Sequence, residues 1–169
     1  NSDGYDDLIF GIYVRDIKTG LHKENEFVKP VIFFWNQITK EYKISEAVQD
    51  KLPEIYFPRR VTSYYDKTKE TTSIFIADHG LDGIHKPNCG AKNPILNFKI
   101  NSNEVSHYYP NPINDYSHGL ISLDLNKDGL LDHLVLNSPY INSQKCKFSK
   151  FTNNSYFLLT NKDGSYKRK

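Results

Sequence analysis

The chain has 169 residues, of which 38% are hydrophobic and 14% aromatic, and its formal net charge at pH 7 is +2. This length suits one domain. Basic and acidic residues are interleaved, whereas a nucleic-acid-binding protein gathers basic residues into a patch or stripe, so we expect no nucleic-acid partner. No apolar run approaches the ~20 residues of a transmembrane helix, so we expect no membrane span.

The N-terminal third predicts a polar segment followed by strands. The chain opens with Asn1, Asp3 and Asp7, a glycine follows Asp3, and a short apolar run comes next. Residues 31–35 and 42–44 are rich in β-branched and aromatic side chains and flank a polar turn. That pattern is typical of a β-hairpin.

The middle third predicts further strands with a weaker polar segment. Residues 74–77 form an apolar strand, and the loop before them carries Lys67 and Lys69 instead of carboxylates. Residues 95–100 predict another strand, which ends at a polar turn over residues 102–104.

The last third contains two short apolar segments, residues 120–123 and 133–136, joined by a loop with oxygen-bearing side chains at every second position. Three unpaired aspartates in so tight a loop would repel each other, and Ca²⁺ takes six to eight oxygen ligands in a flexible shell. We therefore predict a calcium ion held by the side chains of Asp124, Asn126, Asp128 and Asp132 and by the backbone carbonyl of Leu130.

The residues around this loop indicate strands rather than helices. In a helix–loop–helix calcium site the twelfth position is a bidentate glutamate, but here it is Val135, which has no oxygen in its side chain. Short apolar runs bounded by turn residues are typical of strands. After them, residues 156–160 predict a strand that enters a hairpin turn at Asp163-Gly164.

The polar segment at the start of the chain repeats this calcium motif. Residues 1–10 align with residues 126–135, which makes a second candidate site from Asn1, Asp3, the backbone of Tyr5, and Asp7. The first ligand of this site would precede Asn1, and the chain contains no Met, so we expect a segment of a longer protein. The middle copy, with lysines in its loop, should bind calcium poorly.

The copies are spaced by about sixty residues, which indicates a repeat architecture. Each period supplies four strands, and four-stranded sheets repeated radially form a β-propeller. We therefore predict an all-β fold of about three four-stranded propeller blades, over residues 1–50, 51–108 and 109–169. Propellers have four to eight blades, so we expect the remaining blades to come from the same longer chain or from a partner chain.

The run from Asp124 to Asp132 resembles the FG-GAP-like or VCBS repeats of calcium-binding β-propellers. Residues 116–119 resemble the entry strand of such a repeat, and residues 76–80 resemble the exit from its second strand. The resemblance implies a bacterial extracellular or cell-surface protein used for binding or adhesion. We expect a non-catalytic module with a glycan or protein ligand. The alternatives are the non-catalytic propeller domain of a secreted carbohydrate-active enzyme and a subunit of an extracellular assembly.

Several other residues leave alternatives open. Cys89 and Cys146 fall in equivalent loops and form either a disulfide or two free thiols. His79, His85 and Cys89 are candidate zinc ligands. Otherwise Asp78 and His79 lie on a long surface loop and hydrogen-bond the backbone.

The remaining candidates are a hydrolytic triad and an aromatic surface. Asp115, Ser117 and His118 have the residue types of a triad, but neighbours on a strand point to alternate faces, so we expect none. We expect His118 and His133 to be packing or surface residues. The aromatic side chains that contact a glycan or peptide, or else form a small core under their loop, are Tyr140, Phe148 and Phe151.

Overall fold

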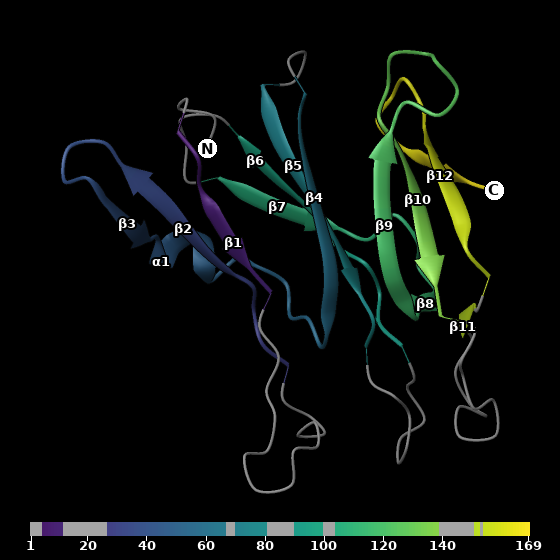
Figure 1. Cartoon of the computed structure of the whole chain (residues 1–169), viewed down its shortest axis with the longest axis horizontal. Helices are drawn as coiled ribbons and strands as arrows, with labels where there is room; N and C mark the ends of the chain where they lie inside the picture. Colours follow the sequence, from purple (N-terminus) through teal and green to yellow (C-terminus); the bar gives the residue numbers. More distant parts are fainter. Residues whose placement is uncertain are drawn as a thin grey trace, which may run out of the picture.

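The computed structural model describes residues 5–11, 27–66, 70–80, 90–99, 104–138, 151–152 (backbone only) and 154–169. These residues form an all-β fold with three antiparallel sheets that lie side by side (Figure 1). Within them, no helix has the length and apolar character needed to cross a membrane.

Each sheet is built from strands that are consecutive or nearly so along the chain. The first sheet contains β1 (Leu8–Phe10), β2 (Val31–Asn36) and β3 (Glu41–Ile44). The second contains β4 (Pro58–Asp66), β5 (Thr71–Asp78), β6 (Ile95–Lys99) and β7 (Val105–Tyr108). The third contains β9 (Ser117–Leu123), β10 (Asp132–Asn137), β12 (Tyr156–Thr160) and β13 (Tyr166–Arg168).

The second and third sheets share one topology, because each pairs its four strands in chain order and antiparallel. The first sheet has the order β1-β2-β3. The strands predicted over residues 31–35, 42–44, 74–77, 120–123, 133–136 and 156–160 are confirmed, and β6 covers residues 95–99 of the strand predicted at 95–100.

Two elements fall outside the predicted four strands per blade. The first is the short helix α1 (Glu46–Gln49), whose Val48 packs into the core beside Leu52. The second is a parallel pair formed by β8 (Asn114–Asp115) and β11 (Phe151–Thr152). Both depend on contacts with distant segments rather than on a local sequence period.

The middle sheet packs on both of its faces, which explains why β5 is buried along most of its length. Successive side chains of a strand point to opposite faces. Toward the first sheet lies a cluster of Ile32, Val48, Leu52, Ile74, Ile76, Leu96 and Phe98. Toward the third sheet lies a cluster of Phe75, Ile95, Val135, Tyr156 and Leu158. These two apolar layers hold the three sheets together.

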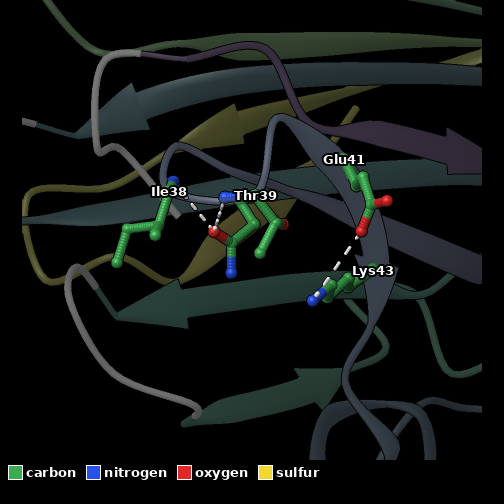
Figure 2. A network of polar contacts seen from close by, with 5 residues as sticks. Ile38, Thr39, Glu41 and Lys43 are labelled. Atoms are coloured by element: carbon green, nitrogen blue, oxygen red, sulfur yellow. Dashed lines mark hydrogen bonds and ion pairs between the residues drawn. The ribbon is translucent and has the colours of Figure 1, made fainter.

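Side-chain contacts fix the turn between β2 and β3. The carboxamide oxygen of Asn36 accepts hydrogen bonds from the backbone N–H groups of Ile38 and Thr39, both at 3.0 Å. Figure 2 shows this turn and the ion pair between Lys43 and Glu41 on the strand that follows, with an N–O distance of 3.9 Å. The pair is exposed and contributes little to stability.

Candidate functional site

The loop predicted to bind calcium joins β9 to β10. It lies at the same end of the sheets as the last residue of β4 and the first residue of β5, the top in Figure 1. Both flanking elements are strands, as predicted. Gly129 has φ +85°, a left-handed conformation that favours glycine, and a Cβ placed there would meet no heavy atom within 4 Å. Glycine is therefore required here by backbone conformation and not by space.

The side chains of the loop turn inward and bind its own backbone. The two Asp124 carboxylate oxygens accept hydrogen bonds from the N–H groups of Asp128, at 3.1 Å, and Gly129, at 2.9 Å. Asn126 Oδ1 accepts from Asp128 N–H at 3.0 Å, and Asp128 Oδ1 accepts from Leu130 N–H at 2.8 Å. The oxygens of three predicted ligands thus converge on one turn.

Asp132 differs from the other loop residues because it is fully buried. Its Oδ2 accepts a hydrogen bond from Leu125 N–H at 3.1 Å, and its Oδ1 accepts from Thr160 N–H at 2.8 Å. One carboxylate therefore ties the start of the loop to β12, two strands away from β9. The hydroxyl of Thr160 also donates to the backbone carbonyl of Leu131, at 2.5 Å.

The first copy of the motif contains the same anchor. Asp7 Oδ1 accepts a hydrogen bond from Trp35 N–H at 3.0 Å. Asp7 precedes Leu8, which pairs with Phe33, and Asp132 precedes His133, which pairs with Leu158. Trp35 and Thr160 each lie two residues beyond those partners, and both hydrogen bonds span 28 residues. Tyr5 is exposed, and the predicted ligands Asn1 and Asp3 lie outside the described residues.

In the middle sheet a neutral pair replaces the carboxylate. Ser73, which aligns with Asp132, pairs across the strands with Asn97, and its hydroxyl donates to the Asn97 carboxamide oxygen at 2.7 Å. Lys67 and Lys69 lie outside the described residues.

The types of ligand in the loop suit a hard cation, since they are carboxylate, carboxamide and carbonyl oxygens. In the structure, however, these oxygens do not form a ready-made site for an ion. Among the described residues, no three His, Cys, Asp or Glu side chains are grouped so that they could hold a metal ion. The carboxylates cap backbone N–H groups instead. An ionised carboxylate has about four lone-pair sites, so these bonds leave each aspartate able to accept a further partner.

Of the three candidate zinc ligands, His79 lies within the described residues, and His85 and Cys89 lie outside them. His79 is buried, and its ring packs edge-on against the rings of Phe57, Tyr116 and His118, with a centroid distance of 4.4 Å to His118. The prediction that Asp78 and His79 lie on a surface loop was wrong, because both are buried at the end of β5.

The prediction that Asp78 hydrogen-bonds the backbone is confirmed. Its carboxylate accepts from the N–H groups of Tyr56, Phe57 and Gly80 at 2.8, 2.7 and 3.0 Å. Burial raises the pKa of this carboxyl, and the three N–H donors oppose the shift.

A buried polar network between the second and third sheets was not predicted. Its side chains come from residues far apart in sequence and are those of Asn93, Asn111, Asp115, Ser117, Asn137 and Tyr156. Asp115 lies at its centre and accepts hydrogen bonds from the Tyr156 hydroxyl and from Asn111 Nδ2, the latter at 2.9 Å. Burial raises the pKa of Asp115, against the effect of these bonds.

Two residues of the candidate triad, Asp115 and Ser117, belong to this network. Ser117 accepts from Asn93 Nδ2 at 2.7 Å and donates to Asn137 Oδ1 at 3.2 Å. His118 is exposed and lies against His79. Ser117 and His118 thus point to opposite faces of β9, as predicted. The one sequence feature that pointed to this network is that Asn93 and Asn111 each precede a proline. The residues around them do not indicate that the two side chains contact the same carboxylate.

His133 is a packing residue, as predicted. Its Nδ1 lies 2.7 Å from the Ser122 hydroxyl, and its ring packs edge-on against Phe75 of the middle sheet with centroids 4.8 Å apart. Burial lowers the pKa of this imidazole to about 4, and the charge of Asp132 acts in the opposite direction. The ring is therefore neutral at physiological pH.

Cys89, Cys146, Tyr140 and Phe148 lie outside the described residues, and of Phe151 the backbone alone is described. Comparison of the chain with protein-family models, with curated proteins and with solved structures found no match.

Proposed function

We propose that the chain is part of a calcium-stabilised β-propeller that acts as a binding, adhesion or scaffold module of a secreted or cell-surface protein. The three sheets would be consecutive blades. Their face-to-face packing through two apolar layers supports this proposal, as does the shared strand order of the second and third sheets.

The observation that carries the proposal is the repeated aspartate anchor. Asp7 and Asp132 occupy the same position relative to their strand pairs, and each accepts a hydrogen bond from a backbone N–H 28 residues further along the chain. Chance placement does not account for equal sequence separation, register and chemistry together. The copies are therefore best explained as repeats of one structural unit.

In this proposal calcium has a structural role. Asp124, Asn126, Asp128, Asp132 and the carbonyl of Leu130 would hold the ion, which would neutralise the loop carboxylates where β9 turns into β10. All these groups come from one loop, which leaves little of the coordination shell for a substrate. We therefore propose a binding or scaffold role rather than a catalytic one.

Thermal unfolding with and without calcium tests the proposal. An ion present at about 100 times its dissociation constant adds ~2.7 kcal/mol to stability, which for a chain of this size raises Tm by roughly 5–10 °C. We expect EDTA to lower Tm, Ca²⁺ to restore it, and Asp128→Ala to lose most of the response.

Asp163→Ala is the matched control, because Asp163-Gly164 repeats the Asp-Gly pair of the loop in an exposed hairpin turn without the ligand series. This variant should keep the full calcium response. A Tm that ignores Ca²⁺, or an Asp128→Ala variant with an unchanged response, would count against the proposal.

A further inference from the structure

A cavity of about 680 Å³ lies between the second and third sheets, at the end where β9 turns into β10. This volume falls within the roughly 300–1,000 Å³ of ligand pockets. Deeper between the same two sheets the interface is apolar, with Phe75 and Ile95 packed against Val135 and Leu158. The lining therefore changes from apolar to polar and aromatic where the cavity opens.

Alternation along the strands of the middle sheet directs different residues into this cavity and into a smaller one. Thr71 and Ser73 of β5 line the 680 Å³ cavity, whereas Thr72 lines a cavity of about 290 Å³ between the first and second sheets. On β4, Ser63 lines the smaller cavity, and Tyr64 lines the larger one together with Tyr65 and Asp66 at the end of the strand. Thr71 and Thr72 therefore lie on opposite faces of β5.

Three tyrosines from two sheets form one wall of the larger cavity. The rings of Tyr108 and Tyr166 stack at a centroid distance of 6.2 Å, and the Tyr64 and Tyr166 hydroxyl oxygens lie 3.4 Å apart. Burial raises the pKa of Tyr108 and of Tyr166. Their hydroxyls therefore keep their protons and act as hydrogen-bond donors as well as acceptors.

The rest of the lining is polar and acidic. Asn97, whose carboxamide oxygen accepts from Ser73, also lines the cavity. Among the described residues that line the cavity, Asp66, Asp124 and Asp163 contribute three carboxylates and Lys162 contributes one ammonium group. With Asp124 given to calcium, Asp66 and Asp163 still outnumber Lys162 among these residues, so the lining disfavours phosphate, sulfate and carboxylate ligands.

We infer that this cavity binds a short neutral saccharide. A pyranose ring presents C–H bonds on its faces and hydroxyls around its rim. Tyrosine rings offer an apolar surface with a polar tip, and threonine, asparagine and aspartate side chains hydrogen-bond hydroxyls. The inference rests on the proposed role as a binding module and names the site and the class of ligand.

Saturation-transfer NMR tests the inference with a set of neutral disaccharides (lactose, maltose, cellobiose and diacetylchitobiose) and a sulfated heparin disaccharide as the anionic probe. At least one neutral probe should receive saturation and the sulfated probe should not. Thr71→Val removes one hydroxyl without changing shape and should weaken binding about tenfold, the value of one hydrogen bond. Tyr64→Ala should weaken it further.

Thr72→Val is the matched control, because the same change is made one residue along β5 on the opposite face. It should leave saccharide binding unchanged. The inference is overturned if no neutral probe binds, if the sulfated probe binds instead, or if both threonine variants behave alike. Thermal unfolding in EDTA and in Ca²⁺ is measured on the same samples. If the Tm does not respond to Ca²⁺ but a neutral saccharide binds, the calcium proposal alone is overturned. If the Tm responds to Ca²⁺ but no neutral saccharide binds, the saccharide site alone is overturned.

Discussion

Replacement of Asp132 by alanine should destabilise the protein strongly even without metal. The carboxylate is fully buried and accepts hydrogen bonds from the backbone N–H groups of Leu125 and Thr160. Hydrogen bonds to a charged group are worth ~1.5–3 kcal/mol each, and removal of the acceptor leaves the donors unpaired. Two such bonds give an expected loss of about 3–6 kcal/mol.

That loss is a large part of the ~5–15 kcal/mol by which domains are stable. For a chain of this size it corresponds to a fall in Tm of roughly 6–24 °C. The assay is thermal and urea unfolding followed by circular dichroism in EDTA, so that the result does not depend on calcium. Asp132→Asn keeps one acceptor oxygen and should fall between Asp132→Ala and the unmodified chain.

Asp163→Ala is again the control, because Asp163 is exposed and accepts hydrogen bonds from the N–H and hydroxyl of Ser165 in its own turn. Its substitution should cost less than about 1 kcal/mol. If the free energy of unfolding of Asp132→Ala is within about 1 kcal/mol of that of the unmodified chain, the carboxylate does not anchor β12 and the reasoning fails.

Three further predictions follow from the described contacts. Asp7→Ala removes the acceptor of the bond from Trp35 N–H and should cost about 1–3 kcal/mol by urea unfolding. A larger loss than that of Asp132→Ala would contradict the equivalence of the two anchors. The pKa of His133 is about 4 in the folded state and 6.5 in the unfolded chain, so the folded state binds fewer protons. The free energy of unfolding should therefore fall by about 3 kcal/mol as the pH drops from about 6.5 to about 4. His133→Asn should remove that part of the pH dependence, and an unchanged dependence of stability on pH would refute the assignment of this effect to His133. Tyr156→Phe removes the hydroxyl that donates to buried Asp115 and should cost about 1–3 kcal/mol, whereas a neutral result would show that this bond contributes nothing.

The sequence was most informative where one strand or loop carried its own signal. Short runs of apolar, β-branched and aromatic residues predicted β2, β3 and β12. The spacing of Asp124, Asn126 and Asp128 predicted a loop between two strands. These features depend on neighbours within a few residues, so they are visible without knowledge of the fold.

Features assembled from distant segments could not be predicted. The helix α1 has four residues, too few for a periodic pattern, and Val48 is placed by its contact with the core. Asp115 meets Tyr156 across 41 residues, and Tyr64 meets Tyr166 across 102. A polar residue beside a strand appears in sequence as a turn or surface residue until its distant partner is known.

A crystal structure of the chain grown in calcium tests the central claim most directly, because it examines the sheets and the ion together. We predict three face-to-face sheets and one ion in the β9–β10 loop, with oxygens of Asp124, Asn126, Asp128, Leu130 and Asp132 at about 2.3–2.6 Å. A loop that stays metal-free in excess Ca²⁺, or sheets that do not pack face to face, would contradict the account.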